Sequence, residues 1–284
     1  MRPNASLDTP SSARVGGSPV RTSGEPALSA DSGKVIVVMP AYNAEKTLER
    51  TVRDIPSGVA DEIILVDDAS GDGTVALAER LGLSVLRHER NRGYGGNQKT
   101  CYRAALERGA DVVVMLHPDF QYDGSLIPHF VGFVRAGICD VMLGARIRTR
   151  REALRGGMPF WKYVMNRILT LLMNVVLGQN LAECHSGFRV YCRRVLETIA
   201  FEENSEDFAF DAELLAQAAF HGFNLGDAPM PVRYFAEASS IGFRDSVVYG
   251  MKILRVLAAF LAQRARLADL RLFAPANREP APSV

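Results

Sequence analysis

Apolar residues gather in five short runs along the chain, and each run is typical of a buried strand. The runs cover residues 35–39, 62–66, 83–87, 112–116 and 140–144. The segments between them have helical character over residues 44–54, 74–81, 98–108 and 126–135. A glycine-rich loop is expected at residues 91–96. Strands that alternate with helices predict an α/β fold, with a mostly parallel sheet and helices on both of its faces.

The pattern changes after residue 146. Residues 145–157 form a basic, glycine-containing segment that we expect to be a loop. Residues 159–177 are strongly apolar, and their apolar side chains recur at helical spacing. Two further helices are predicted at residues 208–221 and 247–267, the second of which carries several basic side chains.

The two ends of the chain differ in composition from the middle. Residues 1–33 are rich in Ser, Pro, Gly and Ala, which is typical of a disordered tail. Residues 273–284 contain three prolines and predict a second tail. We therefore expect a folded domain over residues 34–245, followed by a C-terminal helix at 246–272.

Composition narrows the classes of function. The chain has 284 residues, of which 48% are hydrophobic, and its net charge of +1 gives no electrostatic case for binding nucleic acid. Its four cysteines form no Cys-x-x-Cys pair, so we expect reduced thiols in a cytoplasmic protein. No signal peptide is recognised, and no run reaches the roughly 18 apolar residues that a membrane span needs. We therefore expect the chain not to cross a bilayer.

Candidate ligand-binding residues follow three of the predicted strands. They are the Pro-Ala-Tyr-Asn segment at 40–43, the pair Asp67 and Asp68, and the cluster of His117, Asp119 and Gln121. A parallel sheet places its ligand crevice at the carboxyl ends of its strands. A cation held there by a carboxylate and an imidazole would bind a diphosphate. The plainer alternative is that these are turn residues, with Asn43 and Asp72 capping the helices that follow.

Four segments, in the same order along the chain, resemble the family 2 glycosyltransferases of the GT-A fold. They are Pro-Ala-Tyr-Asn at 40–43, Val-Asp-Asp-Ala-Ser-Gly-Asp-Gly-Thr at 66–74, His-Pro-Asp at 117–119 and Ser-Gly-Phe-Arg at 186–189. The last resembles the dolichyl- or polyprenyl-phosphate mannose synthase branch. The resemblance covers residues 34–245 and implies a nucleotide-sugar half at 34–146 and an acceptor half at 147–245.

The resemblance also implies residue roles. The nucleotide-sugar donor would be held by Pro40, Tyr42, Asp68, Gln121 and Arg146. The metal ligands would be Asp119 and His117. The family has Asp where this chain has His117, and an imidazole favours Mn²⁺ over Mg²⁺. Arg189 and Arg233 would meet the donor diphosphate or an acceptor phosphate, because guanidinium groups bind phosphate oxygens bidentately.

Several alternatives stay open at this point. Arg189 and Arg233 would otherwise pair with acids such as Glu183 or Asp211. The branch's Arg-x-x-Gly-x-Ser-Lys segment, which begins here at Arg233, has no lysine in this chain. A hydroxyl acceptor needs a general base, for which Asp211 is the candidate, with Asp207 four residues earlier on the same helix face. A phosphate acceptor is already an anion and needs no base.

The apolar segment at 159–177 suggests contact with a membrane surface. It contains a tryptophan and follows Arg150, Arg151 and Arg155, and such helices lie in the headgroup plane. The alternative is that it packs on the catalytic domain or on a second subunit in a homo-oligomer. We expect a metal-dependent inverting enzyme, peripheral at the inner face of the membrane, that moves a hexose to a polyprenyl phosphate. A soluble hydroxyl acceptor, with Asp211 as base, and a catalytically silent nucleotide-sugar-binding protein are the alternatives.

Overall fold

The computed structural model describes residues 33–155, 157–233 and 243–276. The two expected tails therefore lie outside the described residues at 1–32 and 277–284, as do residues 234–242, the counterpart of the branch's Gly-x-Ser-Lys. Within the described part, the sheet has seven strands in the order β3-β2-β1-β4-β6-β5-β7. Their bounds are β1 Val35–Ala41, β2 Glu62–Asp67, β3 Ser84–Arg87, β4 Val112–Met115, β5 Val141–Ala145, β6 Arg189–Cys192 and β7 Leu225–Pro229.

All five predicted strands are present, and two more occur that the pattern did not show. β6 pairs antiparallel with both β4 and β5, and every other pairing is parallel. β6 begins with a charged Arg189, and β7 contains Gly, Asp and Pro, which are depleted in strands. Neither segment therefore has the apolar run that marks the first five strands.

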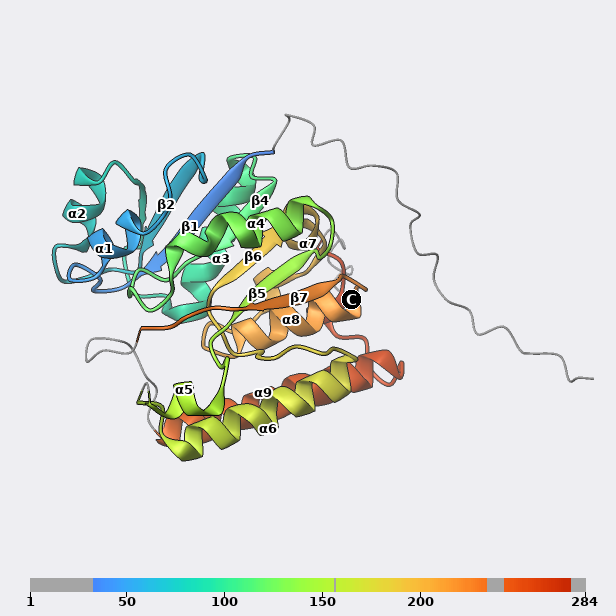
Figure 1. Ribbon diagram of the computed structural model, residues 1–284. Helices are drawn as coiled ribbons and strands as arrows, with labels where there is room; N and C mark the ends of the chain where they lie inside the picture. Colours follow the sequence, from blue (N-terminus) through green and yellow to red (C-terminus); the bar gives the residue numbers. More distant parts are fainter. Residues whose placement is uncertain (1–32, 156, 234–242, 277–284) are drawn as a thin grey trace, which may run out of the picture. The chain divides into compact units, whose positions relative to one another are not determined.

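Helices connect the strands and cover both faces of the sheet (Figure 1). Their bounds are α1 Leu48–Arg53, α2 Thr74–Arg80, α3 Gly93–Glu107, α4 Ile127–Arg135, α5 Arg150–Arg155, α6 Phe160–Leu177, α7 Arg193–Thr198, α8 Phe210–Phe220 and α9 Phe243–Arg264.

Four boundaries correct the sequence predictions. α3 begins at Gly93, so the expected glycine-rich loop forms the first turn of a helix. The expected loop at 145–157 contains the short helix α5. α9 begins and ends before the predicted 247–267. Phe273 is buried and the amide of Ala276 bonds to the carbonyl of Thr198 at 2.9 Å, so packing continues past the expected start of the second tail.

The core forms two layers, one on each face of the sheet. Ile36 and Val38 of β1 pack into one layer, and Val35 and Val37 pack into the other. This alternation follows from the strand's two-residue period, and both faces are apolar because helices cover both. α3 and α8 lie on the first face and α4 lies on the second (Figure 1).

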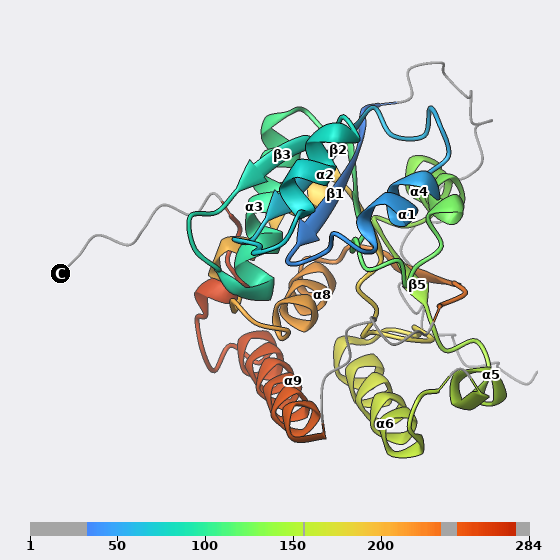
Figure 2. The same ribbon diagram turned by 90° about the vertical axis from the view of Figure 1, so that its left-hand side faces the viewer.

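Helices α6 and α9 pack against each other and lie together beyond α8, away from the sheet (Figure 2). Both expose large apolar side chains, among them Phe160, Leu171 and Val175 of α6 and Met251 of α9. Among the described helices, none combines the length and hydropathy needed to span a bilayer.

Candidate active site

The carboxyl ends of β1, β2 and β4 bring the three predicted segments to one edge of the sheet. Ala41 pairs with Asp67 in the ladder, and Val38 pairs with Met115. The loops after β1 and β2 are joined directly, because the amide of Asn43 donates to Ser70 Oγ at 2.8 Å. The sheet register therefore places these segments beside one another, as the parallel arrangement predicts.

The segment after β1 presents Tyr42 and uses Asn43 to hold its neighbour. Tyr42 is 57% exposed, so its ring is accessible to a ligand, and Pro40 is half-buried beside it. Asn43 has a left-handed φ of 53° and accepts a hydrogen bond from the amide of Gly71 at 2.9 Å. The N-cap position of α1 belongs to Thr47, so the alternative of Asn43 as helix cap is wrong. Its side chain instead ties the first loop to the second.

Asp68 is buried and anchors the start of α3. Its two oxygens accept from the amides of Arg92 at 2.8 Å and Gly93 at 3.0 Å. The ring of His88 also contacts it, with Nδ1 2.7 Å from Oδ1. Asp68 therefore fixes the start of α3 against the end of β2.

The neighbouring Asp67 was a candidate only as half of the Asp-Asp pair, because the resemblance gives the donor-binding role to Asp68. Its Oδ2 accepts from the amide of Ser70 at 3.1 Å. Its Oδ1 is buried and has no hydrogen-bond partner among the described residues. A buried acceptor without a donor is costly, so this oxygen is suited to a ligand N–H. The adjacent acids in the Asp-Asp pair were the available signal.

The glycines at the start of α3 serve chain packing. The amide of Gly95 donates to the carbonyl of Glu206 at 2.8 Å, and a Cβ at Gly95 would lie 2.1 Å from the carbonyl oxygen of Ser205. Lys99 Nζ bonds to the carbonyl of Asn204 and to the Glu206 carboxylate, each at 2.6 Å. The small size of the glycines therefore lets α3 approach the 204–206 segment.

His117 and Asp119 follow β4 and form the centre of the candidate site. Asp119 Oδ1 accepts from the amide of Gln121 at 3.0 Å. Burial raises the pKa of Asp119, although the neighbouring His117 and Arg146 oppose the shift. Burial also lowers the pKa of His117, which favours the neutral, metal-binding imidazole.

A glycine makes room for the imidazole of His117. A Cβ on Gly187 would lie 2.7 Å from both Nε2 and Cδ2 of that ring, so only glycine permits this approach. The amide of Gly187 also donates to the hydroxyl of Tyr122 at 2.9 Å. The Ser-Gly-Phe-Arg segment is thereby fixed against the loop that carries His117 and Asp119.

This donor set fits a cation that shares its ligands with a substrate. Among the residues described, no group of three or more His, Cys, Asp or Glu side chains could hold a metal ion. His117 and Asp119 would supply two ligands. Mn²⁺ and Mg²⁺ accept such partial sites when phosphate oxygens and water complete the shell.

Arg189 is fully buried and engaged inside the protein. Its Nη1 lies 3.6 Å from Asp211 Oδ1 and donates to the Asp211 carbonyl at 2.8 Å. Its Nε donates to the carbonyl of Ser186 at 2.9 Å. Burial alone would lower the pKa of Arg189, but the Asp211 charge raises it above its ordinary value. The ion pair that the sequence allowed as an alternative is thus present, and Arg189 faces Asp211 rather than the crevice.

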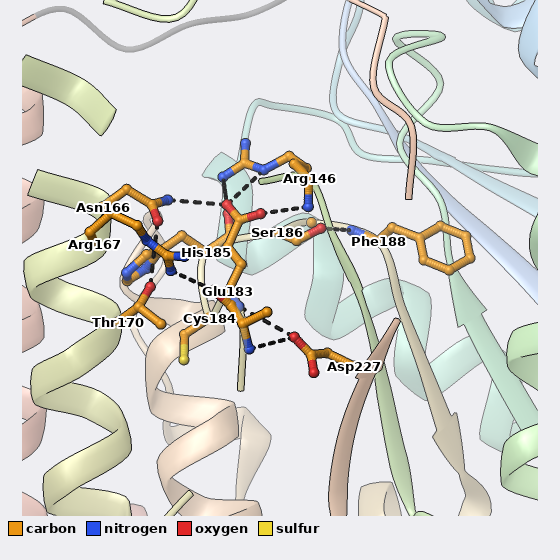
Figure 3. A network of polar contacts seen from close by, with 12 residues as sticks. Arg146, Asn166, Arg167, Thr170, Glu183, Cys184, His185, Ser186, Phe188 and Asp227 are labelled. Atoms are coloured by element: carbon orange, nitrogen blue, oxygen red, sulfur yellow. Dashed lines mark hydrogen bonds and ion pairs between the residues drawn. The ribbon is translucent and has the colours of Figure 1, made fainter. Parts of the chain in front are cut away.

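Arg146 is held by a second buried acid (Figure 3). Its Nε donates to Glu183 Oε1 at 2.9 Å and its amide donates to Oε2 at 2.7 Å, and Asn166 of α6 donates to Oε1 at 3.1 Å. Burial would raise the pKa of Glu183, but Arg146 lowers it. The Arg146 charge also opposes the rise that burial causes in the pKa of Asp119, so this charge reaches the candidate metal site.

Arg233 lies on the other side of the Asp119 loop. It pairs with Asp54 at 2.5 Å and lies 3.7 Å from Asp123, so its partners are neither Glu183 nor Asp211. Its guanidinium stacks 4.2 Å from the ring centre of Phe120, and its amide donates to the carbonyl of Gln121 at 2.9 Å. Arg233 therefore braces the loop that carries Gln121.

Asp207 and Asp211 do not share a helix face, which corrects the prediction. Asp207 precedes α8 and forms an ion pair with Lys252 of α9. Asp211 lies in the first turn of α8, where Oδ2 accepts from the hydroxyl of Tyr94 at 2.7 Å and Oδ1 accepts from Gln98 at 3.3 Å. Together with Arg189, these donors occupy both carboxylate oxygens.

His185 connects this region to α9. Its Nδ1 lies 3.0 Å from the hydroxyl of Tyr249, and its carbonyl accepts from Arg146 at 2.9 Å. Burial lowers the pKa of His185 to about 4, so the ring is neutral at neutral pH. Two long helices therefore reach the site, α6 through Asn166 and α9 through Tyr249.

Comparison of the sequence with known families agrees with this geometry. The pattern of glycosyl transferase family 2 matches residues 36–200, more than half of the chain, and the protein belongs to that family. It is therefore a glycosyltransferase, which favours an enzyme over a silent binding protein.

Two named relatives agree with the predicted branch. The dolichyl-phosphate hexose transferase of Haloferax volcanii is 30% identical over 235 residues, which cover 81% of this chain and 96% of the relative. The UDP-N-acetylglucosamine–dolichyl-phosphate N-acetylglucosaminyltransferase of Methanococcus voltae is 25% identical, over 77% of this chain and 92% of the relative. These names agree with the resemblance to polyprenyl-phosphate sugar synthases.

A solved structure confirms the GT-A fold. Glucosyl-3-phosphoglycerate synthase from Mycobacterium tuberculosis, in complex with Mn²⁺, UDP-glucose and phosphoglyceric acid, superposes with a TM-score of 0.61. The sequences are 20% identical, and the match covers 80% of this chain and 79% of the other. At this identity the likeness concerns the fold.

Proposed function

We propose that this glycosyltransferase moves a hexose from a UDP- or GDP-sugar to a polyprenyl phosphate at a membrane surface. The observation that carries the proposal is the link between the site and the apolar helices. Asn166 of α6 bonds to Glu183, and Tyr249 of α9 bonds to His185. The same two helices expose Leu171, which is 61% exposed, and Met251, also 61% exposed. The surface that would meet lipid is thus built from the helices that brace the site.

The donor would bind at the strand ends. Tyr42 offers an exposed ring for the base, and the orphaned Asp67 Oδ1 offers an acceptor beside Asp68. His117 and Asp119 would hold Mn²⁺ or Mg²⁺, which neutralises charge on a leaving nucleoside diphosphate. The acceptor oxygen would attack the anomeric carbon in line with the departing diphosphate, which inverts that centre.

The hydrogen bonds of Asp211 favour a phosphate acceptor. Both of its carboxylate oxygens are engaged, by Tyr94, Gln98 and Arg189. A general base must have an oxygen within hydrogen-bond reach of the proton that it removes. A phosphate is already an anion at neutral pH, so transfer to it needs no base. These contacts support a phosphate acceptor over the soluble hydroxyl acceptor, for which Asp211 would be the base.

The apolar face of α6 and α9 would hold the enzyme at the inner face of the membrane. An amphipathic helix buries its apolar side at the boundary between headgroups and acyl chains. Binding to anionic vesicles tests this step. We expect Val175→Asp to reduce flotation with the vesicles, while the control Ile138→Asp, at an exposed apolar position away from α6 and α9, binds as the wild type does. Equal binding by both variants would exclude this surface.

The deciding experiment measures transfer from UDP- and GDP-sugars, with Mn²⁺ or Mg²⁺, to a short polyprenyl phosphate. We expect metal-dependent transfer to the lipid and a loss of about 100-fold or more in Asp119→Asn, with UDP still bound. The matched control is Asp111→Asn, which lies just before β4 at the opposite end of the strand and bonds to the amide of Lys34. Donor hydrolysis that the lipid phosphate does not accelerate would overturn the acceptor assignment.

A further inference from the structure

Tyr94 joins the candidate metal site to the buried ion pair, and none of the sequence motifs described above includes it. Its ring stacks on His117 with the ring centres 5.5 Å apart and the planes at 13°. Its hydroxyl lies 2.7 Å from Asp211 Oδ2 and 3.3 Å from His117 Nε2. Asp211 in turn faces Arg189 at 3.6 Å. Four side chains thus form one continuous row.

The protons along this row can be placed by counting donors. A tyrosine hydroxyl has one proton, and a carboxylate beside a guanidinium only accepts. The Tyr94 proton therefore points to Asp211, and the Tyr94 oxygen is left as an acceptor for the imidazole. His117 must then carry its proton on Nε2. In a neutral imidazole the unshared electron pair is on the other nitrogen, which is Nδ1.

The packing around His117 agrees with this placement. Gly187 closes against the same edge of the ring, since a Cβ there would lie 2.7 Å from Nε2. The Nε2 edge is therefore turned toward the protein, against Tyr94 and the Ser-Gly-Phe-Arg segment. Nδ1 lies across the ring from that edge.

We propose that Tyr94 is a positioning residue, which relays the Asp211–Arg189 ion pair to His117 and so presents Nδ1 of His117 as a ligand beside Asp119. The inference rests on the proposed function, in which His117 and Asp119 hold the metal. It gives Asp211 a task other than that of a base.

The expected effect is on metal affinity and on the tautomer. Groups that orient a metal-binding histidine contribute about 10- to 100-fold to affinity when they are removed. Tyr94→Phe keeps the stacked ring and deletes the hydroxyl, so the fold is retained. We expect the Mn²⁺-dependent part of UDP affinity to fall by about 10-fold or more. UDP affinity without metal should stay within about two-fold of the wild type, because Tyr94 would contact the histidine and not the nucleotide.

The decisive readout is the histidine tautomer in the metal-free, full-length protein. Nitrogen-15 and carbon-13 shifts of labelled histidine distinguish the Nε2–H form from the Nδ1–H form. The spectrum would be recorded at about pH 8, above the ordinary histidine range, and the His117 signals would be assigned with His117→Asn. We expect a single Nε2–H form in the wild type and a mixture of both forms in Tyr94→Phe.

A matched control removes the tyrosine hydroxyl that contacts a different buried histidine. Tyr249→Phe deletes the partner of His185 and leaves Tyr94 in place. It should change the His185 signals and leave the His117 tautomer as in the wild type. A His117 signal altered by Tyr249→Phe to the same extent as by Tyr94→Phe would reveal a general packing effect and overturn the relay.

Failure of the relay can be told apart from failure of the proposed function. A wild-type His117 with its proton on Nδ1, or unchanged tautomer and Mn²⁺ affinity in Tyr94→Phe, overturns the relay even if lipid-linked sugar is made. Absence of transfer to any polyprenyl phosphate overturns the proposed acceptor, while an Nε2–H tautomer that depends on Tyr94 still supports the relay.

Discussion

Two regions of the site supply carboxylates, and they find their partners in different ways. In the strand-end loops, Asp72, Asp119 and Asp123 each accept from the backbone amide two residues further along. In the 183–211 region, Glu183 and Asp211 face guanidinium groups that lie 37 and 22 residues away in the sequence. The first set shapes loops. The second set holds the guanidinium groups of Arg146 and Arg189 inside the protein.

This difference separates two energy scales. A carboxylate that accepts from a local amide at a helix start stabilises by about 1 kcal/mol. A buried carboxylate that loses its cation is left as an uncompensated charge, which costs about 3–5 kcal/mol. The following predictions test the contrast, starting with the largest effect.

The buried pair of Arg189 and Asp211 should be the most sensitive point. Arg189→Met removes the cation and is expected to lower the free energy of unfolding by about 3–5 kcal/mol. Urea unfolding monitored by circular dichroism gives this value. Arg189→Met combined with Asp211→Leu should recover most of the loss, because no charge is then left buried. A single variant as stable as the wild type would remove the distinction between the two regions.

His185 should make the second region sensitive to acid. Burial holds its folded pKa at about 4, below the unfolded value near 6.5. A depressed folded pKa contributes stability above the unfolded pKa, and this stability is lost as the pH falls from about 6.5 to about 4. The loss integrates to about 3 kcal/mol, and it should be absent in His185→Gln.

Unfolding free energies measured across this pH range test the point. The control is His129→Gln, which removes an exposed imidazole from α4 and should keep the wild-type slope. If His185→Gln retains the full acid slope, another group is responsible for it.

Local carboxylates should give smaller effects. Asp72 Oδ1 accepts from the amide of Thr74 at 3.1 Å at the start of α2. Asp72→Ala should lower the free energy of unfolding by about 1 kcal/mol, and Asp72→Asn should keep most of it, because asparagine also accepts from the amide. Chemical denaturation compares the three proteins. An asparagine variant as unstable as the alanine variant would mean that the charge matters more than the hydrogen bond.

Exposed pairs should contribute least. Arg53 lies 2.5 Å from Glu49 one helical turn away, and the two side chains are 74% and 45% exposed. Arg53→Lys keeps the charge and should change stability by less than about 0.5 kcal/mol, since water screens such pairs. A loss comparable to that of Arg189→Met would show that depth of burial does not set the scale.

Much of the first region follows from the sequence. The five apolar runs predict β1 to β5, because a strand buried on both faces needs continuous apolar residues whatever its neighbours are. The turns at Asp67 and Asp72 are also local, since donor and acceptor lie within three residues, although the N-cap position of α2 belongs to Gly73 and not to Asp72. The motifs at 40–43, 66–74 and 117–119 therefore identify both the family and the edge of the sheet where the ligand site lies.

Only the tertiary structure decides how the second region is connected. The insertion of β6 between β4 and β5 depends on which sheet edge is available once the other strands have paired. The partners of Arg146, Arg189 and Arg233 depend on segments that approach in space. Tyr94 and Asp211 are 117 residues apart in the sequence, yet their oxygens lie 2.7 Å apart. Hydrophobic period is a property of a short window of sequence, whereas a charge pairs with whichever group the completed fold brings within reach.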